Sequence, residues 1–190
     1  MENLERNLSM LGAEHKLVYG SQSGSPQDAK MSSWIKPPTD SFKFNVDAVV
    51  EDAHSTIAIV ARDWRRIVVL ALSKKVYATI PLQAEAEALV WALTVSVDLN
   101  LERVYFESDS KICVDSLSGA SAPHWRIAGL VSDLILTAAS HPHWSFVWTK
   151  REANCVTHVL AGWSQRCLWG LFGSDSGPSC FLLACSENLK

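Results

Sequence analysis

Three acidic side chains stand where the sequence changes from one pattern to another. Asp47 interrupts the apolar run Phe42–Val50. Glu85 lies near the start of a helix-forming segment, and Asp109 follows the apolar run 104–108. An unpaired carboxylate is costly beside a buried strand, but ligands gather beyond the carboxyl ends of strands in α/β sheets. If the two runs are neighbouring strands and the helix packs across them, the three acids converge at one end of the sheet.

Clustered carboxylates repel one another unless cations neutralise them. A set of oxygen ligands without cysteine suits Mg²⁺ or Mn²⁺ better than zinc. Two such ions about 3.5–4 Å apart can activate a water and stabilise the leaving oxygen of a phosphodiester. The three acids therefore predict metal-dependent chemistry on a phosphodiester.

Each acid also has a plainer interpretation. Asp109 could cap the helix that follows it, and Glu85 and Glu87 could complement a helix dipole. That interpretation fits Glu87 best, whereas Asp47 has few structural reasons to stand in the middle of a strand. Glu107 alternates with its neighbours, and we interpret it as a solvated or groove-edge residue.

Nine elements would position these residues, in the order β-β-β-α-β-α-α-β-α. Three strands joined by short polar links favour an antiparallel meander. The segment that begins at Pro81 is rich in Ala, Glu and Leu, which is typical of a helix. The predicted strands cover 42–50, 55–63, 66–76, 103–108 and 143–149, and the predicted helices cover 81–100, 109–117, 121–140 and 151–167.

Composition bounds the class of protein. The chain has 190 residues, of which 48% are hydrophobic and 19% charged, enough for one packed domain with tails. The net charge of −3 does not mark a general nucleic-acid binder, although an acidic site can offset a basic groove. Five cysteines without a CxxC pair indicate reduced thiols.

The termini frame a single predicted domain. We expect a flexible, Ser- and Gly-rich leader over residues 1–33, a domain over 34–167 and a tail over 168–190. The apolar stretch "CFLLAC" in the tail is expected to be a docked or loosely packed extension. No signal peptide or transmembrane run is recognisable, so we expect an intracellular protein of the cytoplasm or nucleus. The sequence does not indicate an oligomeric state.

Five short motifs occur in a specific order: "KFNVDA", "VARD", "AEAEAL", "FESDS" and "REANCVTHVLA". In this order they resemble the ribonuclease H-like domains of plants, which are similar to the ribonuclease H portion of non-LTR retrotransposon polyproteins. The resemblance covers about residues 34–166. It implies a ribonuclease H-like α/β fold, in which a five-stranded mixed sheet with three antiparallel and two parallel strands is flanked by helices.

The resemblance also implies an activity and a site. It implies a hydrolase that cleaves the RNA strand of an RNA–DNA hybrid as an endonuclease, with two Mg²⁺ or Mn²⁺ ions. Its catalytic, metal-binding acids would be Asp47, Glu85 and Asp109. A fourth catalytic acid would fall at position 158, which is His158 here. The expected partner is nucleic acid, as RNA–DNA hybrid or RNA, and no membrane.

His158 changes the expected chemistry. A neutral imidazole removes one negative charge from the site, and Mn²⁺ accepts a nitrogen ligand more readily than Mg²⁺. We therefore expect weak or absent cleavage with Mg²⁺ and rescue by Mn²⁺. A histidine on a helix beside a pocket is also often only a hydrogen-bonded surface residue.

Further departures from the family pattern bear on activity. Ala48 replaces a glycine after the first acid, and Ile57, Ala58 and Ile59 occupy a strand in which the family has glycines. Glycine permits close approach of a ligand, so we expect these side chains to push a hybrid away. Arg66 takes the place of a turn glycine. The stretch "WTKREAN" also lacks a histidine that active relatives often carry.

Binding can persist where catalysis is lost, because lysine and arginine supply affinity for phosphates. Trp64 and Trp125 could stack on a base or sugar, although ordinary packing explains them equally well. Two functions stay open: a hybrid-cleaving ribonuclease, or a catalytically silent nucleic-acid-binding or protein-interaction remnant of a retrotransposon ribonuclease H. The candidate nucleic-acid-binding residues are Arg62, Lys74, Lys75, Lys111, Lys150 and Arg151.

Overall fold

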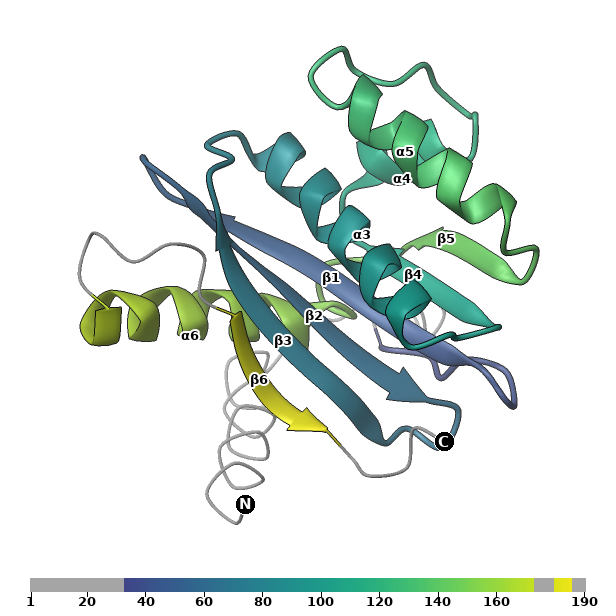
Figure 1. The fold of residues 1–190 in the computed structure, drawn as a ribbon, viewed down its shortest axis with the longest axis horizontal. Coiled ribbons are helices and arrows are strands. Elements are labelled where there is room, and N and C mark those ends of the chain that lie inside the picture. The colour runs from purple at the N-terminus through teal and green to yellow at the C-terminus, as the bar shows by residue number, and fades with distance from the viewer. Residues whose placement is uncertain (1–32, 173–179, 186–190) are drawn as a thin grey trace, which may run out of the picture.

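A mixed sheet forms the centre of the computed structural model, which describes residues 33–172 and 180–185 (Figure 1). In the described part the sheet has six strands in the order β5-β4-β1-β2-β3-β6. The strands are β1 (Phe42–Val50), β2 (Ser55–Asp63), β3 (Val68–Val76), β4 (Val104–Ser108), β5 (Trp144–Trp148) and β6 (Cys180–Cys185). The helices are α3 (Pro81–Asp98), α4 (Lys111–Leu117), α5 (Ala128–Ala139) and α6 (Cys155–Phe172).

The pairing of the first five strands confirms the predicted fold. β1, β2 and β3 form an antiparallel meander, while β4 is parallel to β1 and β5 is parallel to β4. β6 adds a sixth strand, antiparallel to the outer edge of β3. The stretch "CFLLAC" is therefore docked through its backbone, a pairing that the sequence pattern did not predict.

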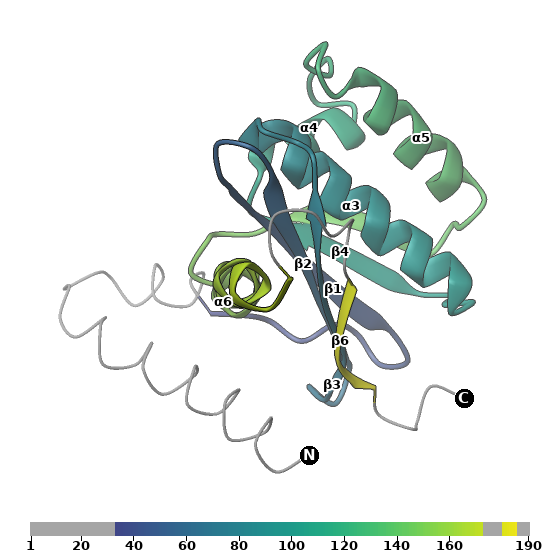
Figure 2. The ribbon, with the colours of Figure 1, turned by 60° about the vertical axis from the view of Figure 1, so that its left-hand side comes forward.

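Helices cover both faces of the sheet. Figure 2 shows α6 on one face and α3, α4 and α5 on the other. Large side chains such as Phe44, Leu89 and Phe106 fill the core between the sheet and α3. The core under α6 is smaller and is built from Ala58, Leu160 and other short apolar side chains. Because β-strand side chains alternate between faces, successive residues of β1 serve different layers.

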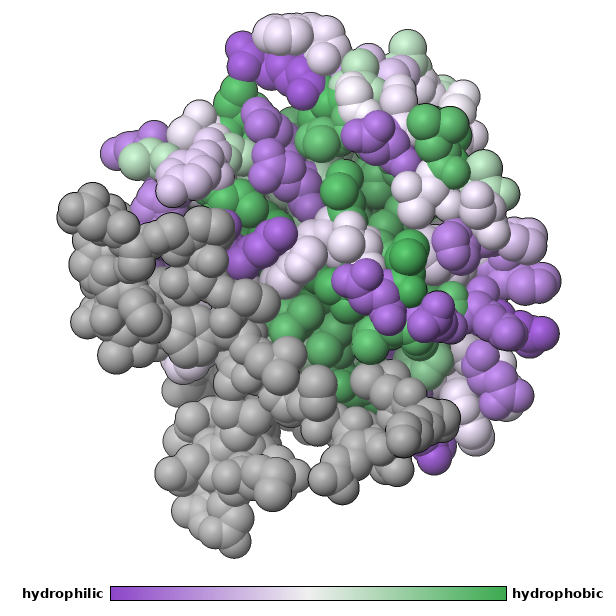
Figure 3. Space-filling view, in the orientation of Figure 1, coloured by the Kyte–Doolittle hydropathy of each residue, from purple (hydrophilic) through white to green (hydrophobic). Residues whose placement is uncertain are grey.

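Hydrophobic side chains also reach the surface beside α3. Figure 3 shows them grouped over the part of the sheet formed by β2 and β3. Several apolar residues of this core, including Val76 and Leu82, are only partly buried. In the part of the chain that the structure describes, no helix is both long and apolar enough to cross a bilayer.

Several helix boundaries differ from the predicted ones. α4 begins at Lys111 with Ser110 at its N-cap, so Asp109 is not the cap. α5 begins at Ala128, within the predicted segment 121–140 and five residues after Pro123. α6 begins at Cys155 rather than at 151, and it continues to Phe172, five residues beyond the predicted end at 167. The predicted boundaries of leader, domain and tail stay predictions, and residues 1–32 lie outside the described part.

The turn between β2 and β3 is built without glycine. Arg66 adopts a left-handed backbone with φ of 75°, which is the conformation that a glycine would adopt without strain. The Asp63 carboxylate accepts hydrogen bonds from the backbone N–H groups of Arg65 and Ile67, both at 2.9 Å. It also pairs with the Arg65 side chain at 2.8 Å. The acid thus stabilises a turn that the side chain of Arg66 disfavours.

Candidate metal centre

The three predicted acids meet at one end of the sheet. Asp47 lies on β1, Glu85 lies one turn inside α3 rather than in its first turn, and Asp109 directly follows β4. Asn45 of β1 is in register with Glu107 of β4, so the parallel strands place Asp47 beside Asp109 two residues later. One carboxylate oxygen from each of the three acids lies within 4.8 Å of the others. The predicted convergence is therefore confirmed.

Two buried oxygens of the cluster lack a hydrogen-bond partner. They are Oδ1 of Asp47, whose residue is fully buried, and Oε2 of Glu85. A buried carboxylate oxygen without a donor is costly, and each such group calls for an explanation. Three converging carboxylates with two unpartnered oxygens fit a hard divalent cation such as Mg²⁺ or Mn²⁺. Asp47, Glu85 and Asp109 would hold it.

The cluster shifts the acidity of its members. Burial raises the pKa of Glu85 well above its usual range, and the charges of Asp47 and Asp109 raise it further. Burial and the charge of Asp47 also raise the pKa of Asp109, while the guanidinium of Arg151 opposes that shift. Both shifts have the direction expected for like charges held together away from water.

His158 faces the cluster from α6. Its Nδ1 donates to Oδ2 of Asp47 at 2.7 Å, and 38% of its side chain is exposed. The start of α6 is fixed to β1 by Asn154, whose Nδ2 donates to the carbonyl oxygen of Val46 at 2.7 Å. His158 therefore reaches the acids, as its sequence position implied, but its contact is with a carboxylate.

Arg151 adds a cationic group at the same place. Its Nη1 lies 3.6 Å from Oδ2 of Asp109, and its Nη2 lies 3.2 Å from Nδ1 and 3.1 Å from Nε2 of His158. The Arg151 side chain is 62% exposed. Sequence reasoning listed Arg151 only as a phosphate contact, because the turn that brings it over the acids has no sequence signature.

A buried polar network lies next to the acids on the same two strands. Nζ of Lys43 pairs with Oε1 of Glu107 at 2.5 Å, and both side chains are 8% exposed. Asn45 donates to the other oxygen of Glu107 at 2.9 Å and accepts from the indole N–H of Trp34 at 2.8 Å. The interpretation of Glu107 as solvated or at a groove edge is therefore wrong. The alternation of Lys43 and Asn45 with apolar residues on β1 was the signal that could have revealed this network.

The six predicted nucleic-acid contacts have different surroundings in the structure. The guanidinium of Arg62 lies 5.0 Å from the centre of the Trp34 ring, which covers it. Lys74 lies 4.6 Å from the ring centre of Trp91. Lys111 pairs with Asp115 on α4. Lys75 ends β3, while Lys150 and Arg151 border the acid cluster. The role of all six stays a prediction.

The expected obstruction by the second strand is not found. Ile57, Ala58 and Ile59 are fully buried, so their side chains point into the two cores and not toward a ligand. The expectation that they push a hybrid away is therefore wrong. Their side chains fill the cores on the two faces of the sheet.

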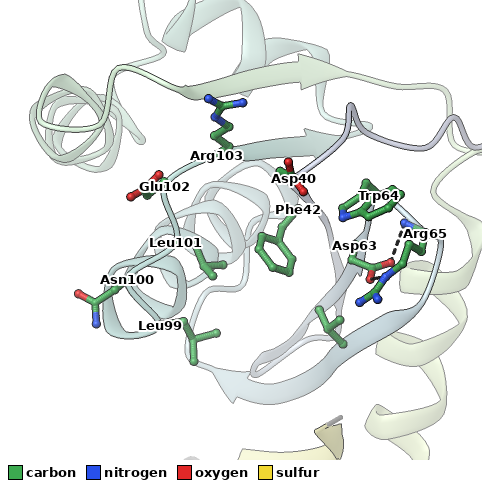
Figure 4. A pocket seen from close by; sticks show the side chains of 11 residues that line it. Asp40, Phe42, Asp63, Trp64, Arg65, Leu99, Asn100, Leu101, Glu102 and Arg103 are labelled. Atoms are coloured by element: carbon green, nitrogen blue, oxygen red, sulfur yellow. Dashed lines mark hydrogen bonds and ion pairs between the residues drawn. The ribbon is translucent and has the colours of Figure 1, made fainter. Parts of the chain in front are cut away.

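A hollow lies at the end of β1 opposite the acid cluster (Figure 4). It has a volume of about 370 Å³ and lies between the start of β1, the β2–β3 turn and the segment that joins α3 to β4. Phe42 and Leu101 line it, and the paired side chains of Asp63 and Arg65 border it. It contains none of the candidate metal ligands, but it is lined by Trp64, which the sequence offers as a possible stacking residue.

Comparison with known proteins agrees with this geometry. A family model described as reverse transcriptase-like matches residues 44–164, which include all three acids and His158. No curated protein matches the sequence.

Solved structures share the fold at low sequence identity. Ribonuclease H1 from the archaeon Halobacterium salinarum is 18% identical, with a TM-score of 0.59 over 67% of this chain and 98% of that one. The compost-derived LC11 ribonuclease H1, solved in complex with RNA/DNA hybrid, is 18% identical, with a TM-score of 0.60 over 67% and 99%. A foamy viral protease-reverse transcriptase in complex with dsDNA is 13% identical, with a TM-score of 0.54 over 66% and 96%. These matches establish the ribonuclease H-like fold.

Proposed function

Because the chain belongs to the reverse transcriptase-like family of ribonuclease H-like domains, we propose that it binds nucleic acid and cleaves the RNA strand of an RNA–DNA hybrid with a divalent metal. The observation that carries the proposal is the convergence of Asp47, Glu85 and Asp109 with two unpartnered buried oxygens. A divalent ion bound there supplies Lewis-acid stabilisation of charge and a reactive water at neutral pH.

The side chains around the acids have separate tasks in this proposal. Asp47 lies within β1 and Asp109 directly follows β4, so the sheet fixes their backbone and their carboxylates need little reorganisation to bind a cation. Trp148 fixes the turn by donating from its indole N–H to the Asp109 carbonyl oxygen at 3.1 Å. Lys150 and Arg151 border the site and can contact phosphates of a bound strand.

His158 is expected to weaken the activity. It supplies no negative charge, and it engages an oxygen of Asp47 that a metal would use. We therefore expect little cleavage with Mg²⁺ and more with Mn²⁺, which accepts imidazole nitrogen. Replacing His158 by aspartate restores the acid of the family pattern and should raise the rate with Mg²⁺.

The test is cleavage of an end-labelled RNA–DNA hybrid with Mg²⁺ and with Mn²⁺. The native chain, Asp47→Asn and His158→Asp are compared, and Arg103→Gln serves as a control at the far end of β4. Cleavage that is metal-dependent and lost in Asp47→Asn supports the proposal. Cleavage that survives in Asp47→Asn comes from a contaminant, and no cleavage in any variant with either ion removes the catalytic part of the proposal.

A silent nucleic-acid-binding domain is the second candidate. It is favoured by the pairing of Asp47 with His158 and of Asp109 with Arg151, which already engages oxygens that a metal ion would use. Binding of hybrid that weakens with salt, without turnover, would support this candidate. A placement among plant domains close to non-LTR retrotransposon ribonucleases H rests on the motif order, and it stays a prediction.

A further inference from the structure

The acid cluster is partly closed by two side chains that act as one unit. Nη2 of Arg151 lies within 3.2 Å of both ring nitrogens of His158. A donor in the plane of an imidazole can approach only one ring nitrogen this closely. The guanidinium therefore lies against the face of the ring, an arrangement that arginine adopts readily. We call this unit the Arg151–His158 stack.

The stack contacts both Asp47 and Asp109. His158 Nδ1 is 2.7 Å from Oδ2 of Asp47, and Arg151 Nη1 is 3.6 Å from Oδ2 of Asp109. Its contacts leave Asp47 Oδ1 and Glu85 Oε2 without a hydrogen-bond partner. One set of oxygens is thus engaged by protein side chains, while the other is still open to a ligand.

The balance of charge limits how many divalent ions the site can hold. Three ionised carboxylates carry three negative charges, and one divalent ion with one guanidinium carries three positive charges. A second divalent ion would leave an excess of positive charge in a largely buried site, which is unfavourable. The fourth acid that would have balanced it is absent, because position 158 is histidine.

We infer that the centre takes one divalent ion rather than two, and that Arg151, held on the face of His158, supplies the remaining positive charge. This inference rests on the proposed function, since it concerns the same acids. It makes Arg151 a competitor of the metal for Asp109 and a ready donor to a phosphate oxygen at the same point. It differs from the two-ion centre that the resemblance implies.

The test counts ions directly. Mn²⁺ is titrated into the full chain at neutral pH, with free Mn²⁺ followed by electron paramagnetic resonance and the heat of binding by calorimetry. We expect one Mn²⁺ for the native chain and two for the double variant His158→Asp, Arg151→Gln. Arg151→Gln alone should still bind one ion, about fivefold more tightly, because a neighbouring positive charge is gone.

Two controls make the result specific. Arg103→Gln removes the same charge from an exposed site at the far end of β4 and should bind as the native chain does. Asp47→Asn should lose the ion, and far-ultraviolet circular dichroism confirms that each variant is folded. Two ions in the native chain, or an unchanged affinity in Arg151→Gln, overturn the inference and leave the proposed function intact. No Mn²⁺ bound by the native chain overturns the proposed metal-dependent function itself.

Discussion

Lys43 and Glu107 form a buried ion pair across β1 and β4, with Lys43 four residues before Asp47 and Glu107 two residues before Asp109. The two strands are therefore joined by opposite charges just before the point where like charges meet. The attraction between Lys43 and Glu107 opposes the repulsion between Asp47 and Asp109. The ion pair therefore helps to keep the two acids at a separation suited to a cation. This arrangement links the stability of the sheet to the geometry of the site.

Lys43→Met should destabilise the domain by about 3 kcal/mol, because it leaves Glu107 buried with its charge uncompensated. The double variant Lys43→Met, Glu107→Leu should lose less than the sum of the two single variants, as expected for groups in contact. The free energy of unfolding in urea measures both. Lys111→Met, which breaks an exposed pair on α4, is the control and should change it by about 0.5 kcal/mol or less. An additive double variant would contradict the coupling.

Arg66→Gly should stabilise the domain by about 0.5–1 kcal/mol, since it relieves a left-handed backbone conformation at a side-chain-bearing residue. A higher urea midpoint with an unchanged slope would show this. Arg65→Gly is the matched control, because it also introduces a glycine but removes the ion pair with Asp63. It should be destabilising, and an equal gain from both variants would contradict the role of the backbone angle.

Asp63 should make stability depend on pH in the acidic range. Burial alone would raise the pKa of Asp63, but hydrogen bonds from the Arg65 side chain and from the backbone of Ile67 and Arg65 lower it overall. Because the folded pKa is lowered, this stabilisation is complete above the unfolded pKa of about 3.9 and is lost as pH falls through the folded pKa. The difference in unfolding free energy between the native chain and Asp63→Asn should therefore shrink below about pH 4. A constant difference would contradict the assignment.

Glu85→Gln should stabilise the metal-free chain while it weakens metal binding. The pKa of Glu85 is raised by burial and by the charges of Asp47 and Asp109, so Glu85 destabilises the fold progressively as pH rises above the unfolded pKa. The variant should be more stable by about 1 kcal/mol at neutral pH and similar to the native chain near pH 4. Thermal unfolding without and with Mn²⁺ measures both effects. A less stable variant at neutral pH would contradict the repulsion in the cluster.

Cys113 should be unreactive in the folded chain. Burial raises the pKa of its thiol to about 11, so only about one thiol in a thousand is ionised at pH 8. Alkylation by iodoacetamide, located by peptide mass spectrometry, should modify Cys113 only after unfolding. The partly exposed Cys155 is the internal comparison and should be modified earlier. Rapid labelling of native Cys113 would contradict its burial.

The sequence predicted the parts of the fold that follow from local patterns. Alternating strands and an Ala- and Glu-rich helix were sufficient for the five-stranded sheet and α3. Asp47 and Asp109 could be placed together because parallel neighbouring strands end at the same edge. Glu107 could not be placed, since its burial depends on Lys43, which lies 64 residues away in the chain. β6 was not predicted either, because a short apolar run carries no information about the edge that it joins.

The contacts of Arg151 and His158 could not be predicted from the sequence, for a related reason. The Arg151 side chain reaches the acids from an irregular turn between β5 and α6. The resemblance put His158 at the fourth position of the site, and the residue does lie beside Asp47, but the partner of its ring depends on tertiary packing. The backbone of Arg66, by contrast, followed from the missing turn glycine.

The contacts of Trp34 indicate where a fragment of this domain must begin. Its indole ring donates to Asn45 and lies against Lys43 and Arg62, at 5.4 and 5.0 Å from the ring centre. β1 begins at Phe42, so Trp34 precedes the strand and still covers its polar side chains, Lys43 and Asn45. A fragment cut at the first strand would therefore expose these buried charges to water. The smallest transplantable unit begins at the tryptophan, and a fusion or hybrid protein built from this fold should carry it along.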